Sequence, residues 1–162
     1  MEKKWWHHLT AYQIYTRSFC DSNGDGIGDF QGIISKLDYL QELGIGAIWI
    51  SPFNDSPNYD NGYDISDYYA ILKDFGTMAD LEEMIQECEK RDIIVMMDLV
   101  LNHCSHEHPW FLEACKDRNG KYHDYYIWEE GTADQPPEGS AAFFGGNVWE
   151  WVPQVKEYYY HT

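Results

Sequence analysis

Positive charge is scarce in this sequence. It contains 11 Lys and Arg residues against 28 Asp and Glu residues, which gives a formal net charge of −17 at pH 7. Nucleic acids and anionic membrane surfaces repel a protein surface with this much negative charge. The composition therefore argues against nucleic acid and membranes as partners.

Long apolar runs and paired-cysteine motifs are also missing. No stretch approaches the roughly 18 consecutive apolar residues that suggest a membrane-spanning helix. Residues 1–15 lack the apolar core of a secretory signal. The four cysteines show no C-x-x-C or zinc-ribbon spacing. We therefore expect reduced thiols and a cytoplasmic protein.

Apolar runs and helical stripes alternate along the first hundred residues or so. The predicted strands span residues 11–15, 45–50 and 93–97. Such runs suit strands that are buried on both faces of a parallel sheet. A helix with one apolar stripe is predicted at residues 31–43, with Gly44 as its C-terminal cap. A second helix begins after Thr77, with Asp80 as the partner in a capping box. This order predicts an α/β fold with right-handed crossovers.

The remaining segments have weaker patterns. Residues 53–75 are predicted to form a long loop, and a loop of that length in a compact domain is usually functional. After residue 103 the chain is rich in Tyr, Trp, Glu, Gly and Pro. Within it we predict a short helix at residues 110–116 and short strands at residues 122–128 and 157–161.

The stretch around Asp98 combines a buried strand with polar residues at its carboxyl end. Asp98 interrupts the apolar run, and Asn102 and His103 follow four and five residues later. In α/β folds the carboxyl ends of parallel strands carry the chemistry. The alternative is that Asp98 only binds loop amides while Asn102 and His103 open a turn.

Residues 21–29 form a second polar motif, rich in aspartate and glycine. Its oxygen donors match loop positions 1, 3, 5, 7 and 9 of a calcium-binding loop: Asp21, Asn23, Asp25, the backbone carbonyl of Ile27, and Asp29. Position 12, where a bidentate Glu would stand, is Gly32, so the motif is not an EF-hand. We predict a structural Ca²⁺ or Mg²⁺ site. The alternative is an Asx-rich turn without metal.

Four segments together resemble the α-amylase family of glycoside hydrolases. Asp98-x-x-x-Asn102-His103 resembles the first conserved region of that family. Residues 11–15 are similar to its first barrel strand, residues 21–29 to its metal loop, and residues 60–64 to its loop after the second strand. The resemblance covers nearly the whole chain. It is strongest to the group of oligo-1,6-glucosidases, α-glucosidases and trehalose-6-phosphate hydrolases.

The resemblance implies a (β/α)8 TIM barrel, which typically needs about 250 residues. A chain of 162 residues is therefore expected to be an amino-terminal portion of such a protein. Residues 1–103 would supply the first three β/α units of the barrel. Residues 104–162 would begin the small domain that the family inserts after the third strand.

The resemblance also implies an activity. It suggests a retaining α-glucoside hydrolase that acts on the non-reducing-end glucosyl residues of short oligosaccharides or disaccharides. Such an enzyme uses a carboxylate nucleophile and a second carboxylic acid. In the family these are an Asp and a Glu after later strands, so we expect them beyond Thr162. No catalytic residue is expected in this chain, and the 162-residue piece alone is predicted to be inactive.

Site residues can be carried over from the family by position. Asp60 and Tyr63 would hold the terminal glucose, and His103 would donate to one of its hydroxyls. Asp98 and Asn102 would support them, since such groups fix the geometry of binding residues. The alternative is that Asp60 is a solvated loop residue and Tyr63 a packed aromatic residue.

Phe144 stands where the family has an aromatic residue that lines the entrance to the site, although core packing of the small domain explains it equally well. Two rival functions also remain open. One is a non-catalytic relative that serves as a binding or assembly protein. The other is an isomerase or transglycosylase that uses the same pocket.

Overall fold

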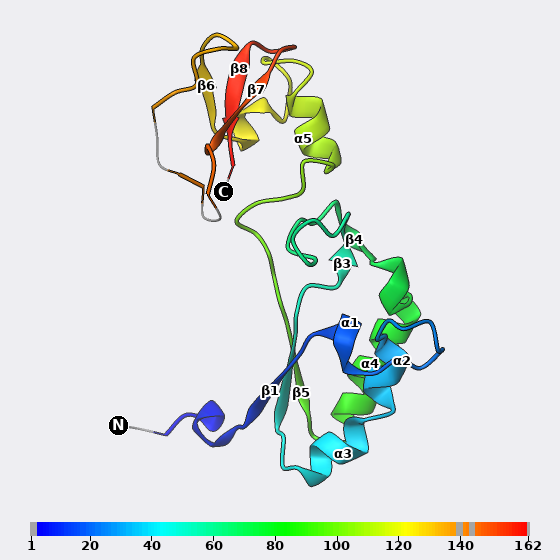
Figure 1. The fold of residues 1–162 in the computed structure, drawn as a ribbon. Coiled ribbons are helices and arrows are strands. Elements are labelled where there is room, and N and C mark those ends of the chain that lie inside the picture. The colour runs from blue at the N-terminus through cyan, green and yellow to red at the C-terminus, as the bar shows by residue number, and fades with distance from the viewer. Residues whose placement is uncertain (1–2, 139–140, 143–144, 162) are drawn as a thin grey trace. The chain divides into compact units, whose positions relative to one another are not determined.

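The structure, a computed structural model, describes residues 3–138, 141–142 and 145–161. The chain divides into two compact units, Met1–Ser105 and His106–Thr162. Figure 1 shows the helices and strands of each unit.

A parallel three-stranded sheet forms the centre of the first unit. Its strands are β1 (Ala11–Ile14), β2 (Ala47–Ile50) and β5 (Ile94–Met97), in the order β1-β2-β5. Ala11 pairs with Ala47, and Ala47 pairs with Ile94, so the three strands end at the same edge. The prediction of three parallel strands at these places is confirmed.

Helices α2, α3 and α4 lie along one side of this sheet (Figure 1). The helical elements of the unit are η1 (Trp5–His8), α1 (Thr16–Phe19), α2 (Phe30–Ile34), α3 (Leu37–Glu42), η2 (Lys73–Phe75) and α4 (Met78–Glu89). The single helix predicted at residues 31–43 is wrong, because the chain turns at Ser35 and Lys36. The Ser35 hydroxyl donates to the Gly32 carbonyl oxygen at 2.7 Å. Such bonds from a serine side chain to the preceding turn compete with regular helix.

The capping box predicted for α4 is confirmed. The Thr77 side chain accepts a hydrogen bond from the Asp80 amide at 3.3 Å, and the Asp80 carboxylate accepts one from the Thr77 amide at 2.7 Å. These bonds satisfy amides that the first helical turn leaves without partners.

The core lies between the sheet and the helices. Its fully buried members include Ile14, Phe30, Ile33, Leu37, Leu40, Ile48, Ile50 and Met84. The prediction that residues 93–97 are buried on both faces is wrong. Ile94 and Met96 are about 40% exposed, at 39% and 42%. Within the described residues β5 pairs only with β2, so its outer edge and one face lack neighbours.

The segment predicted as a loop at residues 53–75 contains a small hairpin. Strand β3 (Asn54–Asp55) pairs antiparallel with β4 (Asp67–Ile71), and a bulge falls between Asn54 and Asp55. The Asn54 side chain also donates to the Tyr68 carbonyl oxygen at 3.0 Å. Strands this short are stabilised by such local contacts, which hydrophobic alternation does not reveal.

The second unit is a short helix with an antiparallel sheet. Its elements are α5 (Pro109–Ala114), η3 (His123–Tyr125), β6 (Trp128–Glu130), β7 (Trp149–Val152) and β8 (Glu157–Tyr160), with strand order β6-β8-β7. The helix and the last strand lie where the sequence predicted them. The strand predicted at residues 122–128 is wrong, because residues 123–125 form a 3₁₀ turn that the Trp128 indole closes by donating to the His123 carbonyl oxygen at 2.8 Å.

Strand β7 was not predicted. Its residues Trp149–Val152 lie in a segment with many glycines and aromatic residues, and the periodicity there is weak. Among the residues that the structure describes, no helix has the length and apolar character needed to cross a bilayer.

Candidate functional site

Residues 60–64 form a tight turn in the first unit, after the β3 strand. Asn61 and Gly62 both have positive φ, at 52° and 96°. A side chain at Gly62 would meet the Pro52 carbonyl oxygen at 3.1 Å, so glycine suits both the backbone and the space. The Tyr63 amide donates to the Asp60 carbonyl oxygen at 3.0 Å and closes the turn.

The Asp64 carboxylate stabilises this turn through three hydrogen bonds. It accepts hydrogen bonds from the Ser56 hydroxyl at 2.8 Å, the Tyr59 amide at 2.9 Å and the Asp60 amide at 3.0 Å. A carboxylate that gathers backbone amides fixes the path of a loop. This role of Asp64 was not predicted from the sequence, although a carboxylate four residues after Asp60 in a glycine turn was a usable signal.

The structure brings Tyr63, Asp98, Asn102 and His103 together at the carboxyl edge of the sheet. The Tyr63 hydroxyl donates to Asp98 Oδ2 at 3.1 Å. His103 Nε2 lies 3.1 Å from the Tyr63 carbonyl oxygen, and His103 Nδ1 lies 3.1 Å from Asn102 Nδ2. Two segments that are distant in the sequence, residues 60–64 and 98–103, therefore meet in one hydrogen-bonded group.

The partners of His103 indicate its tautomer. The Asn102 side-chain nitrogen can only donate, so Nδ1 of His103 accepts. The proton of a neutral imidazole is then on Nε2, and it points to the Tyr63 carbonyl oxygen. Because His103 is exposed, a hydroxyl group from solvent or from a ligand can compete for that proton.

Asp98 is held by the sheet and by Tyr63. Its amide donates to the Ile50 carbonyl oxygen at 3.1 Å, which extends the pairing of β2 and β5 by one residue. Burial raises the pKa of the Tyr63 hydroxyl, and the Asp98 carboxylate raises it further, with a smaller contribution from the charge of Asp60. Tyr63 therefore stays protonated and remains a donor.

Asp60 is exposed at the tip of the turn, beside this group. Phe144 lies outside the described residues. A cavity of about 150 Å³ in the first unit is lined by Ser22, Asn23, Asp29, Gln31, Lys73, Asp74, Phe75, Gly76 and Asp80, and not by Asp60, Tyr63 or His103. Asp60, Asn102 and His103 are exposed, so the group around Tyr63 presents polar side chains to solvent.

The predicted metal loop is folded back on its own side chains. Asp21 accepts from the amides of Asn23, Gly24 and Gly26 at 2.7–3.0 Å. Asn23 and Asp25 each accept from the amide two residues on. The amides of Gly26 and Gly24 hold the pKa of the Asp21 carboxyl below its usual range. The loop thus keeps an ionised carboxylate among closely spaced oxygen atoms.

The donor chemistry of this loop fits a hard cation, because every candidate ligand is an oxygen atom. Asp29 is already engaged, since its carboxylate caps α2 through the Gly32 amide at 2.6 Å and accepts from Ser22 at 2.8 Å. No cluster of three or more His, Cys, Asp or Glu side chains that could hold a metal occurs within the described parts of the chain. A cation here would therefore also need Asn23, the Ile27 carbonyl or water.

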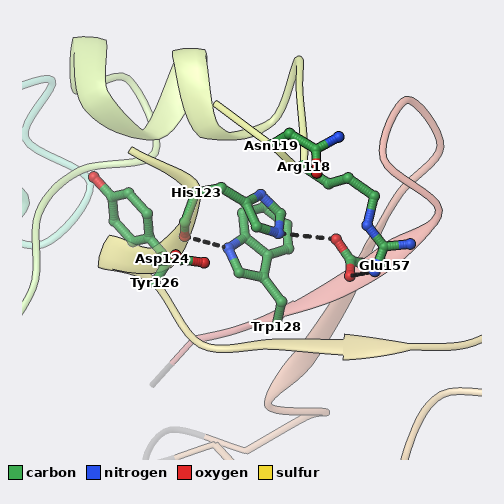
Figure 2. Close-up of a pocket in the computed structure, with 7 residues that line it drawn as sticks. All are labelled: Arg118, Asn119, His123, Asp124, Tyr126, Trp128 and Glu157. Carbon is green, nitrogen blue, oxygen red and sulfur yellow. Dashed lines mark hydrogen bonds and ion pairs between the residues drawn. The ribbon is translucent and has the colours of Figure 1, made fainter. Parts of the chain in front are cut away.

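A separate charged cluster lies in the second unit beside a cavity of about 460 Å³ (Figure 2). Glu157 is 4% exposed and lies 2.9 Å from Arg118 Nη2 and 3.0 Å from His123 Nε2. The His123–Glu157 contact has no aligned hydrogen bond, since Glu157 Oε2 receives none. His123 also contacts the Ala114 carbonyl oxygen at 3.2 Å and stacks on Trp128 with ring centroids 4.5 Å apart.

This cluster connects the elements of the second unit. Glu157 belongs to β8, His123 to η3 and Ala114 to α5. The sequence does not reveal this cluster, because Glu157 lies far along the chain from Arg118 and His123 and none of the three belongs to a motif. Its burial and its contacts indicate a structural role.

Comparison with known proteins decides the family. Residues 13–162 match the alpha-amylase family, described as the alpha amylase catalytic domain. The chain belongs to the α-amylase family. The chain is 56% identical over 161 residues to oligo-1,6-glucosidase of Bacillus cereus, a match that covers 99% of this chain and 29% of the relative. It is 53% identical, with the same coverage, to glucan 1,6-alpha-glucosidase of Streptococcus pneumoniae.

Solved structures of α-amylase family members match the fold. Isomaltulose synthase from Klebsiella sp. LX3 gives a TM-score of 0.96 at 51% identity, over 99% of this chain and 29% of that one. Trehalose-6-phosphate hydrolase of Bacillus licheniformis gives 0.94 at 49% identity, over 98% and 29%. The prediction of an α/β fold that forms the first β/α units of a TIM barrel is confirmed. The chain spans about 29% of the length of these relatives.

Proposed function

We propose that this chain forms the glucose-binding edge of a retaining α-glucoside hydrolase that acts on non-reducing ends of short oligosaccharides or disaccharides. The observation that carries the proposal is the hydrogen-bonded group of Tyr63, Asp98 and His103 at the carboxyl edge of the sheet. In barrel enzymes that edge bears the active site. Two relatives are named oligo-1,6-glucosidase and glucan 1,6-alpha-glucosidase, and these names support the substrate class.

In this proposal the polar edge recognises sugar hydroxyls. The exposed Asp60 carboxylate accepts from two adjacent hydroxyls, and His103 donates from Nε2 once a hydroxyl replaces the Tyr63 carbonyl oxygen as its partner. Tyr63 stacks on the sugar ring while its hydroxyl stays on Asp98. Bonds that tighten as the ring distorts would lower the barrier rather than only hold the substrate.

The bond-breaking carboxylates are assigned to polypeptide outside residues 1–162. A retaining mechanism needs two carboxyl groups about 5 Å apart across the scissile bond. Asp98 is not assigned to either role, because its carboxylate is committed to the Tyr63 hydroxyl. Its role in the proposal is to orient Tyr63, while Asn102 orients His103 through Nδ1.

The decisive experiment uses the full-length protein that contains this chain and p-nitrophenyl α-glucoside as the substrate. His103→Ala should lower kcat/KM by about 100-fold, the size expected for loss of one hydrogen-bond donor to the transition state. His106→Ala, an exposed histidine in the following segment, is the matched control and should leave the value unchanged. Unchanged kcat/KM in the His103 variant would remove His103 from the site.

The same preparation separates the rival functions. A binding or assembly protein would give heat on titration with maltose but no glucose release. An isomerase would convert sucrose to an isomeric disaccharide rather than to glucose and fructose, and one relative is named isomaltulose synthase. Product analysis by chromatography distinguishes these outcomes.

A structural Ca²⁺ or Mg²⁺ ion in the loop at residues 21–29 is part of the proposal. Asp21, Asn23, Asp25, the Ile27 carbonyl and Asp29 would hold it, and the ion would stiffen the connection between α1 and α2. The ionised Asp21 and the all-oxygen donor set support this assignment. A cytoplasmic location is also proposed; the free thiols of Cys20, Cys88 and Cys115 support it.

A further inference from the structure

The hydroxyl of Tyr68 touches the segment that carries His103. Tyr68 belongs to β4, and its Oη lies 2.9 Å from the Val100 carbonyl oxygen and 2.7 Å from the His103 carbonyl oxygen. Burial raises the pKa of this hydroxyl, so it remains a donor at neutral pH. One proton is shared between two acceptors, as in three-centre hydrogen bonds elsewhere in proteins. The hydroxyl thus joins both ends of residues 100–103.

The segment buries few apolar side chains among the described residues. Val100 is buried, but its neighbours Leu99 and Leu101 are 70% and 72% exposed. Farther along the chain, the Ser105 amide donates to the Ile65 carbonyl oxygen at 2.9 Å. A segment with few buried apolar contacts opens easily unless polar contacts restrain it. The Tyr68 hydroxyl is such a restraint, and it acts on the backbone of His103 itself.

Tyr68 is in turn fixed by its own strand. Asn54 of β3 donates from Nδ2 to the Tyr68 carbonyl oxygen at 3.0 Å. On the other side of the segment, His103 reaches the Tyr63 carbonyl oxygen through Nε2. The path of His103 is therefore set by Tyr68 at its backbone and by Tyr63 at its ring.

We propose that Tyr68 is a positioning residue, which holds the 100–103 segment so that the His103 imidazole faces the glucose-binding edge. The inference rests on the function proposed above for His103. Tyr68 touches no substrate in this scheme, and its whole effect passes through the histidine. Removing the hydroxyl leaves two carbonyl groups without their shared donor and lets the segment shift.

The first test measures kcat/KM of the full-length protein on p-nitrophenyl α-glucoside. Tyr68→Phe should lower it by about 10-fold, since a displacement near 1 Å in a catalytic site costs up to about 100-fold. Tyr69→Phe is the matched control. Its ring is 89% exposed on the same strand, and the substitution should change kcat/KM by less than about 2-fold.

The second test asks whether the effect passes through His103. In a His103→Ala background, Tyr68→Phe should cause no further loss, because the group that it positions is gone. A further loss of about 10-fold in that background would show that Tyr68 acts elsewhere, and it would overturn the proposal.

A third measurement does not depend on activity. The imidazole signals of His103 are assigned by NMR from their disappearance in His103→Ala. Tyr68→Phe should shift or broaden these signals, and Tyr69→Phe should leave them in place. If the protein releases no glucose from any α-glucoside, the proposed function fails, while unmoved His103 signals in Tyr68→Phe would refute the positioning role on their own.

Discussion

Among the glycines that the structure describes, Gly32 has the least space for a side chain. It lies in α2 and packs against Cys20, which directly precedes the loop at residues 21–29. A Cβ at this position would lie 1.8 Å from the Cys20 carbonyl oxygen and 2.6 Å from the carbonyl carbon. The Cys20 oxygen cannot simply turn away, because it accepts a hydrogen bond from the Asp29 amide at 3.1 Å. Gly32→Ala therefore forces two backbone segments apart.

The size of the effect follows from this geometry. A shift of roughly 1.5 Å is needed to restore a carbon–oxygen contact of about 3.3 Å. Overpacking of this kind costs about 1–3 kcal/mol, and backbone atoms place it at the upper end. Loss of the Asp29 cap on the Gly32 amide costs about 1 kcal/mol more. Replacing glycine inside a helix returns about 1 kcal/mol. We expect a net loss of about 3 kcal/mol.

Urea unfolding followed by circular dichroism measures this loss. With a slope of about 2 kcal/mol per molar urea, the midpoint should fall by about 1.5 M. Gly46→Ala is the control, because its Cβ would meet only the tip of the Leu9 side chain, at 2.6 Å from Cδ2. That tip can rotate aside, so the control should lose less than about 1 kcal/mol. Equal midpoints for the two variants would refute the steric argument.

Three further predictions concern the metal loop, the α4 cap and the charged cluster of the second unit. Ca²⁺ should raise the melting temperature of the wild-type protein, and Asp21→Ala should abolish that rise in calorimetry. Asp80 has a lowered pKa, chiefly through hydrogen bonds from Thr77 and Gln31. It therefore stabilises the fold above its ordinary pKa and loses this effect as the pH falls through its lowered value. Asp80→Asn should accordingly be less stable than wild type at pH 7, with a smaller difference at pH 3, as read from urea midpoints. His123→Ala should destabilise the second unit by about 2 kcal/mol, because it removes the ring stacked on Trp128 and one of the two side-chain partners of the buried Glu157 carboxylate, and thermal unfolding would show it.

Each of these predictions has a matched control. Asp134→Ala removes an exposed aspartate far along the chain from the loop and should keep the response to Ca²⁺. Glu82→Gln neutralises an exposed carboxylate on α4 and should show no change in relative stability between pH 7 and pH 3. His106→Ala removes an exposed histidine and should leave unfolding unaffected. An Asp21 variant that keeps the full Ca²⁺ response, a constant Asp80→Asn difference, or an unaltered His123 variant would contradict the corresponding reasoning.

The order of strands and helices in the first unit could be predicted from the sequence because apolar residues recur there with the spacing of helices and strands. The apolar stripe of Leu37 and Leu40 and the capping box at Thr77 are local features, and they survive in the structure. The break at Ser35 could not be predicted in this way, since a serine hydroxyl that bonds back to a carbonyl leaves the hydrophobic pattern unchanged. The exposure of Ile94 and Met96 depends on which neighbours cover a strand, and that information is not in the strand itself.

The residues of the candidate site also differ in whether the sequence reveals them. Asp60, Tyr63 and His103 could be proposed as site residues from the sequence because they lie in recognisable motifs. Asp64 and Tyr68 could not, because their roles consist of hydrogen bonds to backbone groups. A backbone carbonyl or amide carries no sequence signature of its own. Residues that position a site through the backbone are therefore the ones that sequence patterns miss most readily.

Gly32 affects both the packing of α2 and the set of ligands that the loop at residues 21–29 could offer to a cation. In a calcium-binding loop of the EF-hand type, this position would supply a bidentate carboxylate. Here α2 has already begun at Phe30, and the Cys20 backbone occupies the space that any side chain at residue 32 would need. Helix α2 can pack this closely against the Cys20 backbone only if residue 32 has no side chain, and therefore no carboxylate ligand. The cation proposed for this loop would therefore be held by oxygens within residues 21–29 and by water, which favours a modest affinity and a role in stability rather than in sensing.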